Sequence, residues 1–279
     1  MSIVRAFESR ISTSMGEVCS KTWIGAASRA ANSAPIFLLH DSLGCVELWR
    51  KFPERLAAEL GRTVVAYDRI GFGKSAPHPE KLASTFVHDE ATSTFKAVAD
   101  YFGIERFVVF GHSVGGGMAV EIASQFPLAC EALITESAQA FVEDRTLKAL
   151  EMAKLDFMRP GQIDRLKKYH GDKAEWVLSA WIDTWLSPEF AGWSLDQPAQ
   201  KVTIPLLAIH GENDEYGSSE HPFRIASQVK GPSTVRMLSR CGHVPHKEVP
   251  EAVLSMVSRL LVSAESGSIS RTSSTHGTT

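Results

Sequence analysis

The chain has 279 residues, of which 44% are hydrophobic and 22% are charged, and its formal net charge is −3. This length and composition predict a globular protein of one or two domains with a large buried core. The small negative charge, without a long basic run, disfavours nucleic acid and an anionic membrane surface as partners.

The sequence contains features from which the cellular compartment of the protein can be predicted. No stretch of the sequence approaches the roughly 20 consecutive apolar residues of a membrane span, and the first ten residues do not form a signal-peptide pattern. The four cysteines are scattered without a C-x-x-C spacing. This usage is typical of reduced thiols and not of a disulfide framework or a zinc site, so we expect a cytoplasmic protein.

The first elements along the chain are a hairpin and then alternating strands and helices. Residues 8–25 predict two antiparallel strands that turn at Met15–Gly16. Between residues 35 and 135, short apolar runs alternate with helical stretches, two of which end at Gly61 and Gly103. Continuous apolar strands separated by helices are typical of a parallel sheet that is covered on both faces.

The alternation stops after residue 141 and resumes at residue 205. Between them the sequence predicts helices only, so we expect a helical cap at 141–200 inserted into a core formed by 1–140 and 201–263. Such an insertion can cover a site at the carboxyl edge of the sheet. The Ser/Thr/Gly-rich ending, 264–279, is predicted to be a disordered tail.

The most specific motif is G-x-S-x-G at residues 111–115, with Ser113 at its centre. It directly follows an apolar strand and opens a helix, which is the context of a nucleophile elbow. The turn is so tight that side chains at Gly111 and Gly115 would collide with neighbouring elements. The sequence therefore predicts that Ser113 is a nucleophile at the top of the sheet.

A serine nucleophile needs a base, and the base needs an orienting acid. For an elbow of this kind the expected chain order is Ser, then Asp or Glu, then His. Asp214 follows the strand at 205–211, and His243 lies in the loop after the next strand. We therefore predict that Ser113, Asp214 and His243 form a catalytic triad.

Other polar residues of the sequence are candidates for the same roles. Glu136 ends another strand and is the alternative acid, whereas Glu212 and Glu215 are expected to face solvent. His246 is expected to pack or cap at the start of the final helix. His112 and His210 are expected to support the site from behind. Neither His112 nor His210 has a metal-ligand partner at a usable spacing, so no metal is predicted.

With these residues placed, the chain resembles the α/β-hydrolase superfamily over about residues 5–262. The stretches "DSLGCVELW" and "VVAYDRIGFGKSAP" look like the branch of 3-oxoadipate enol-lactonases and small carboxylesterases. The resemblance implies the α/β-hydrolase fold: a mostly parallel eight-stranded sheet, helices on both faces and a helical cap after strand 6. Two departures are His40–Asp41, where many relatives have His-Gly, and Ile70 within the "DRIGFGKS" loop.

The resemblance to α/β-hydrolases also implies an oxyanion hole made of backbone N–H groups, those of Val114 and Ser42. His40 is expected to brace this loop, and Asp41 to orient the loop or a water molecule. Apolar groups near the site are expected to line a substrate pocket. The predicted pocket residues are Leu43, Phe141, Phe157, Trp181 and Trp185.

These residues predict a serine hydrolase that cleaves small to medium apolar esters or lactones through an acyl-enzyme. Two alternatives stay open: a C–C bond hydrolase of vinylogous diketones or cofactor-free perhydrolase, and a triad-bearing ligand sensor with slow turnover. The phosphate-loop pattern fails at Asp68, where it requires glycine, and no dinucleotide fingerprint follows a strand, so no cofactor is expected. The expected partner is a small-molecule ester or lactone, and a homodimer is left open.

Overall fold

A computed structural model describes residues 4–25 and 33–272. Its centre is one eight-stranded sheet in the order β1-β2-β4-β3-β5-β6-β7-β8. The first two strands form the predicted hairpin, and β2 also pairs antiparallel with β4, while β3 to β8 run parallel. The strands are β1 Arg5–Thr13, β2 Gly16–Ile24, β3 Ile36–Leu39, β4 Val64–Tyr67, β5 Phe107–His112, β6 Cys130–Glu136, β7 Leu206–Gly211 and β8 Ser233–Leu238.

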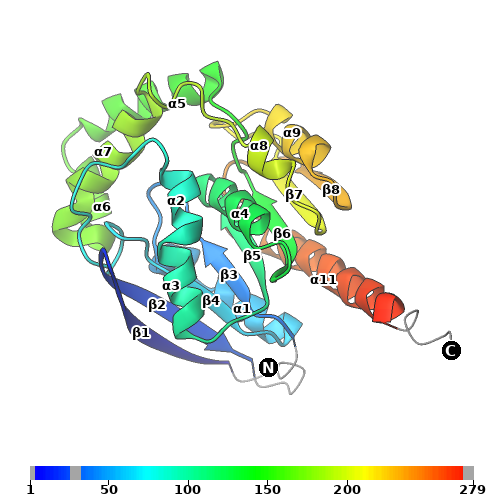
Figure 1. The fold of residues 1–279 in the computed structure, drawn as a ribbon. Coiled ribbons are helices and arrows are strands. Elements are labelled where there is room, and N and C mark those ends of the chain that lie inside the picture. The colour runs from blue at the N-terminus through cyan, green and yellow to red at the C-terminus, as the bar shows by residue number, and fades with distance from the viewer. Residues whose placement is uncertain (1–3, 26–32, 273–279) are drawn as a thin grey trace, which may run out of the picture.

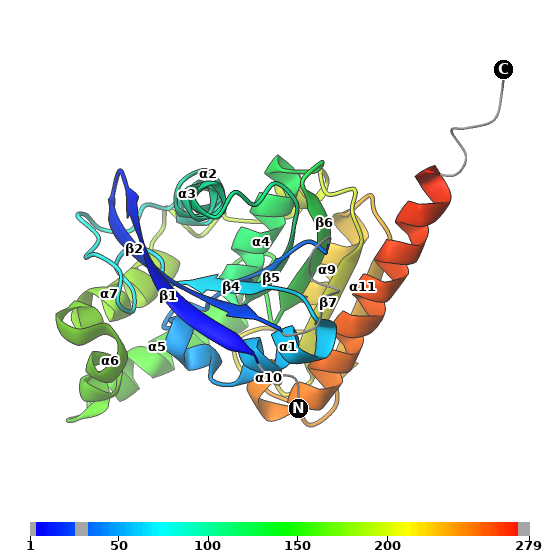
Figure 2. The same ribbon diagram turned by 90° about the horizontal axis from the view of Figure 1, so that it is seen from below.

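Helices cover both faces of this sheet because its inner strands are apolar on both sides. In β3, Phe37 and Leu39 belong to one buried cluster, and Ile36 and Leu38 belong to the other. The first cluster lies under α2 Phe86–Thr92, α3 Thr94–Tyr101, α4 Val114–Gln125, α8 Asp196–Ala199 and α9 Glu220–Gln228. The second lies under α1 Phe52–Leu60 and α11 Pro250–Thr272, on the opposite side in Figure 2.

The helical insertion after β6 arches over one end of the sheet (Figure 1). We call residues 141–200 the cap. The chain enters and leaves it side by side, since Phe141 and Ser194 form an isolated β-bridge and Leu195 N–H donates to the Ala140 carbonyl at 2.8 Å. The cap contains α5 Asp144–Phe157, α6 Gln162–His170, the 3-10 turn η3 Gly171–Lys173 and α7 Ala174–Trp185, followed by α8.

The sequence-based prediction of the sheet and of its helical covering is confirmed, but the ending differs. Helix α11 continues to Thr272, so residues 264–272 are helical and not disordered as predicted. A helix that is already anchored by buried Val253, Val257 and Leu261 can extend without a new nucleation step. Residues 273–279 of the predicted tail lie outside the described residues.

Among the described residues, no helix combines the length and the apolar character that crossing a membrane requires.

Candidate active site

Ser113 occupies the turn between β5 and α4 in a conformation that L-residues rarely adopt, with φ 54° and ψ −126°. The glycines on either side make the turn sterically feasible. A Cβ at Gly111 would lie 1.9 Å from the Gly115 carbonyl oxygen, and one at Gly115 would lie 2.2 Å from the Leu39 oxygen. The side chain of Ser113 is thus placed at the carboxyl edge of the sheet, as a nucleophile elbow requires.

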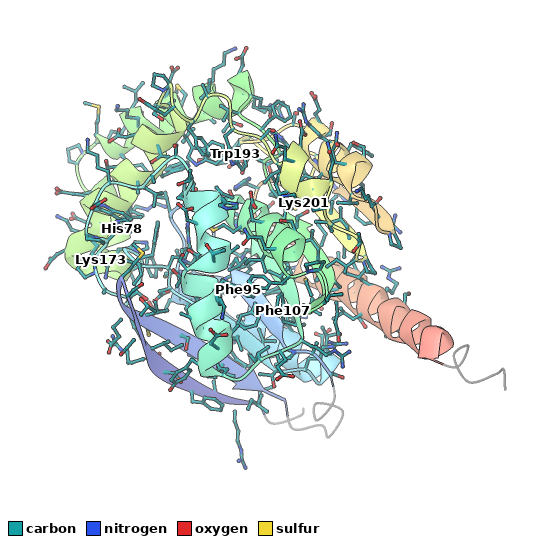
Figure 3. The ribbon with its side chains drawn as sticks, in the orientation of Figure 1. His78, Phe95, Phe107, Lys173, Trp193 and Lys201 are labelled. Carbon is teal, nitrogen blue, oxygen red and sulfur yellow. The ribbon has the colours of Figure 1, made fainter. Side chains whose placement is uncertain are left out.

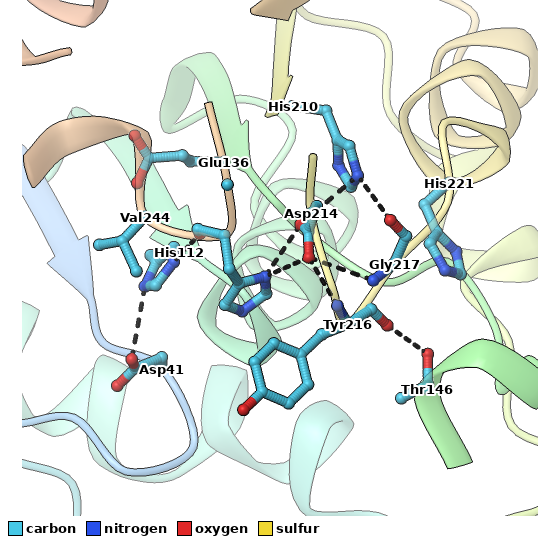
Figure 4. Close-up of polar contacts among 12 residues, drawn as sticks. Asp41, His112, Glu136, Thr146, His210, Asp214, Tyr216, Gly217, His221 and Val244 are labelled. Atoms are coloured by element: carbon cyan, nitrogen blue, oxygen red, sulfur yellow. Dashed lines mark hydrogen bonds and ion pairs between the residues drawn. The ribbon is translucent and has the colours of Figure 1, made fainter. Parts of the chain in front are cut away.

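Asp214 and His243 come together at the same edge of the sheet, from the loops after β7 and β8. His243 Nδ1 lies 2.9 Å from both carboxylate oxygens of Asp214 (Figure 4). Asp214 is 2% exposed and also accepts the backbone N–H groups of Tyr216, at 2.8 Å, and Gly217, at 3.2 Å. Because Nδ1 donates to the carboxylate, Nε2 of the neutral ring is left as a proton acceptor.

The pKa of His243 is raised and the pKa of Asp214 is lowered, and both shifts favour an ion pair between the two side chains. Burial lowers the pKa of His243, but the hydrogen bond to Asp214 and the charge of that carboxylate outweigh it, so the pKa is raised. Burial raises the pKa of Asp214, but the hydrogen bond from His243 and its charge outweigh this effect, so that pKa is lowered. Asp214 therefore stabilises a protonated His243.

The alternative acid, Glu136, is paired with a different histidine. Glu136 Oε2 lies 2.5 Å from His246 Nδ1, and both side chains are buried. Burial raises the pKa of Glu136 to about 7 and lowers the pKa of His246 to about 3. With His112 they form a group whose ligand atoms lie within 4.8 Å of one another, a spacing that could hold a metal ion. Glu136 Oε2 and His246 Nδ1 already hydrogen-bond to each other, whereas Glu136 Oε1, which is also buried, has no hydrogen-bond partner among the described residues.

His112 and His210 lie behind the pair that Asp214 and His243 form. His112 Nε2 donates to the His243 carbonyl at 2.8 Å, and its Nδ1 lies 3.6 Å from Asp41 Oδ2. His210 Nε2 donates to the Gly217 carbonyl at 3.1 Å and lies 3.4 Å from Asp214 Oδ2. Burial lowers the pKa of both histidines, to about 4 for His112. Both therefore remain neutral and hold the loops that carry the acid and the base.

The loop of residues 40–44 lies between β3 and the 3-10 turn η2 Val46–Trp49, beside the elbow. The Asp41 carbonyl accepts hydrogen bonds from His40 Nδ1 and Arg69 Nη2, both at 2.8 Å. Val114 is the first residue of α4, so its N–H belongs to the first turn, where backbone donors have no partner within the helix. This arrangement is compatible with the predicted N–H donors, Ser42 and Val114.

The cap holds loops on both sides of the site. At the acid loop, Arg145 Nη1 donates to the Asp214 carbonyl at 3.1 Å. Thr146 Oγ1 donates to the Tyr216 carbonyl at 2.6 Å (Figure 4). At the loop of residues 40–44, His170 Nε2 donates to the Leu43 carbonyl at 3.1 Å. The cap is therefore fixed to the two loops that surround the predicted nucleophile.

A second set of cap contacts reaches the loop after β4. His170 Nδ1 accepts the Gly73 N–H at 2.9 Å, and Lys173 Nζ donates to the carbonyls of Gly73 and Ser75 at 2.8 Å. Figure 3 shows Lys173 and His78 on this side of the molecule, far from Lys201 and Trp193.

The predicted pocket residues have different positions. Trp181 is half-buried and contacts Tyr216 at 5.8 Å between ring centroids, and Tyr216 contacts His243 at 4.9 Å. Leu43 and Phe157 are half-buried. Phe141 lies at the base of the cap, with its ring 4.8 Å from that of His221.

Trp185 does not fit the predicted pocket. It is only 3% exposed and packs against Phe190 and Trp193, with ring centroids 5.1 and 5.7 Å away. It belongs to the internal packing of the cap and offers almost no surface to a substrate.

Sequence reasoning missed three residues at the site: Tyr216, Arg69 and His170. Tyr216 could have been noticed because it lies only two residues after Asp214, in the same short loop. Arg69 appears in the "DRIGFGKS" loop, but its contact with Asp41 joins residues 28 positions apart. His170 reaches Leu43 across 127 positions, and a histidine in a helical cap gives no local signal of such a contact.

The fold and the site together define the class of protein. It is an α/β protein with a strained serine between a strand and a helix, and with a buried Asp–His pair at the same edge of the sheet. Residues 34–161 match the family described as alpha/beta hydrolase fold. The chain therefore has the α/β-hydrolase fold.

Comparisons with individual proteins show relatives that are distant. An uncharacterised protein of Mycobacterium tuberculosis is 34% identical over 119 residues, which cover 42% of this chain and a third (33%) of that protein. The monoglyceride lipase of Rattus norvegicus is 24% identical over 249 residues, 81% of each chain. The crystal structure of the carboxylesterase CesB from Bacillus subtilis superposes with a TM-score of 0.68 at 21% identity, over 92% of each chain. This structural likeness supports the fold alone.

Proposed function

We propose that this protein is a serine hydrolase that cleaves carboxylic esters or lactones through an acyl-enzyme on Ser113. The observation that carries the proposal is the bifurcated contact of His243 Nδ1 with the buried carboxylate of Asp214, at the sheet edge where Ser113 occupies a strained elbow. A neutral imidazole held through Nδ1 is an effective general base for a hydroxyl group. Distant relatives that are named lipases and carboxylesterases favour ester substrates.

In this mechanism Ser113 Oγ attacks the acyl carbon as its proton passes to His243 Nε2. The tetrahedral oxyanion accepts hydrogen bonds from the N–H groups of Ser42 and Val114. His243 then protonates the leaving alcohol, and the acyl-enzyme forms. A water molecule that gives its proton to His243 attacks the acyl carbon in turn, and the acid is released with Ser113 restored.

The substrate class follows from the side chains next to the base. Tyr216 and Trp181 form an aromatic wall that leads from His243 to the cap. Aromatic surface of this kind suits alkyl or aryl groups better than sugars or peptides. We therefore propose small to medium apolar esters or lactones as substrates.

Labelling with a fluorophosphonate probe, followed by mass spectrometry, tests the nucleophile. We expect an adduct on Ser113, hydrolysis of p-nitrophenyl acyl esters by the wild type, and loss of at least about 10³-fold in kcat for Ser113→Ala. Ser124→Ala is a matched control, because Ser124 lies on the helix that follows Ser113 and its hydroxyl donates to the Glu121 carbonyl of that helix. Full turnover by Ser113→Ala, or an adduct on another residue, would contradict the proposal.

A further inference from the structure

Arg69 is a buried cation that lies directly behind the loop of residues 40–44. It follows β4, is 4% exposed, and its guanidinium lies 4.3 Å from the centre of the Phe72 ring. Its backbone N–H donates to His40 Nε2 at 3.2 Å, which leaves the proton of that ring on Nδ1. Its Nη2 donates to the Asp41 carbonyl at 2.8 Å.

Keeping a guanidinium in this position has a cost, because burial removes its hydration. Burial lowers the pKa of Arg69, and electrostatic interactions with Glu90, Tyr67 and Asp41 act against that change. An arginine nevertheless stays protonated in proteins. The positive charge of Arg69 is therefore in direct hydrogen-bond contact with the Asp41 carbonyl.

The Asp41 carbonyl and the Ser42 N–H belong to one peptide unit. None of the peptide bonds of the described residues is cis. In a planar trans peptide the C=O and N–H groups point in opposite directions. Fixing the carbonyl toward Arg69 therefore aims the Ser42 N–H away from Arg69. Donors that polarise the carbonyl also strengthen the N–H of the same unit as a donor.

Two further hydrogen bonds keep this unit from rotating. The Asp41 carbonyl also accepts from His40 Nδ1 at 2.8 Å and from the Gly44 N–H at 3.2 Å. The Leu43 carbonyl, two units further on, is held by His170 at 3.1 Å. Among these donors to the Asp41 carbonyl, Arg69 is charged and comes from the loop after β4, whereas His40 and Gly44 belong to the same loop as Asp41.

We propose that Arg69 is a positioning residue that orients and polarises the Ser42 N–H for the oxyanion. This inference rests on the proposed function, in which Ser42 is one of the two oxyanion donors. An oxyanion donor acts mainly in the transition state, so loss of Arg69 lowers kcat and leaves KM almost unchanged.

The test compares Arg69→Met and Arg69→Lys with a matched control, Arg62→Met. Arg62 is also buried and also donates to a backbone carbonyl, that of Ala34 at 2.7 Å. It lies before β4 and Ala34 lies before β3, at the sheet edge opposite the active site. The control therefore removes a buried guanidinium, with its hydrogen bond to the Ala34 carbonyl, without touching the loop of residues 40–44.

Three quantities are measured: kcat, KM, and the inhibition constant of a trifluoromethyl ketone, which forms a tetrahedral oxyanion adduct with a serine nucleophile. Relative to Arg62→Met, we expect Arg69→Met to lower kcat by about 10- to 100-fold and to raise the inhibition constant of the ketone by a similar factor. The KM of the two variants should agree within about threefold. Arg69→Lys keeps the charge but not the planar fork, so a smaller fall of the same kind is expected. If Arg69→Met does not fold, the comparison of Arg69→Lys with Arg62→Met tests the inference instead.

Two results overturn the inference: kcat within threefold of the control, or a fall in kcat that leaves the affinity for the ketone within threefold of the control. These outcomes differ from a failure of the proposed function. In that case the wild type does not hydrolyse any ester, or Ser113→Ala retains the activity. If instead Ser113 is required and Arg69 is not, only the positioning role is rejected.

Discussion

Replacing Asp214 with asparagine tests the mechanism most directly. Both carboxylate oxygens lie 2.9 Å from His243 Nδ1, and the same carboxylate accepts the N–H groups of Tyr216 and Gly217. An asparagine has one oxygen, which the two backbone donors would retain, so its NH₂ group would face Nδ1. The ring would then carry its proton on Nε2 and could not accept one from Ser113.

The expected loss can be estimated from this change of tautomer. In another serine hydrolase, the equivalent exchange lowers kcat by about 10⁴-fold, which corresponds to about 5.5 kcal/mol of transition-state stabilisation. We expect a loss of the same order here, because Asp214 is 2% exposed and is the acid that contacts His243. The measurement is kcat and kcat/KM on a p-nitrophenyl ester near neutral pH, together with thermal unfolding to show that the variant is folded.

Glu136→Gln is the matched control for that experiment. Glu136 is another buried acid at this edge, but it contacts His246, and glutamine can still accept a hydrogen bond from that ring. We expect kcat of this variant to stay within about tenfold of the wild type. A folded Asp214→Asn protein with less than a tenfold loss, or a larger loss for Glu136→Gln, would refute the assignment of Asp214 as the acid.

Three further predictions concern pH and backbone geometry. Because the pKa of His243 is raised above 6.5 and the base must be neutral, kcat/KM should rise with pH through an apparent pKa above 6.5; a pH-independent rate from 5 to 8 would contradict this. Burial lowers the pKa of His112 from 6.5 to about 4, so the folded state binds fewer protons than the unfolded state and stability is lost as pH falls below 6.5. Between pH 7 and pH 5 the urea unfolding free energy of the wild type should fall by about 2 kcal/mol more than that of His112→Gln, and equal falls would exclude His112 as a cause. Gly115→Ala should destabilise the fold by about 3 kcal/mol or more, because its Cβ would lie 2.2 Å from the Leu39 oxygen, whereas Gly192→Ala, which has open space, should be close to neutral in thermal unfolding.

The features that sequence analysis predicted well are those with a local signal. Apolar runs of strand length and helices ended by glycine predicted the parallel sheet and its covering, and the G-x-S-x-G motif predicted the elbow that the backbone of Ser113 adopts. The order of Ser113, Asp214 and His243 along the chain was enough to predict which acid would contact the base. These properties depend on a few consecutive residues and on the rule that parallel strands place their carboxyl ends at one edge.

Other features depended on which residues meet across the folded chain. The pairing of Glu136 with His246 spans 110 positions, and the support of the loop of residues 40–44 by Arg69 and His170 joins three separate segments. Trp181 and Trp185 are four residues apart on one helix, yet one contacts Tyr216 and the other is enclosed by the cap. The sequence by itself determined the fold and the three residues of the proposed triad, because periodicity and motif spacing are local. Only the tertiary structure decided which side chains orient them, because burial and hydrogen-bond partners are set by packing between distant segments.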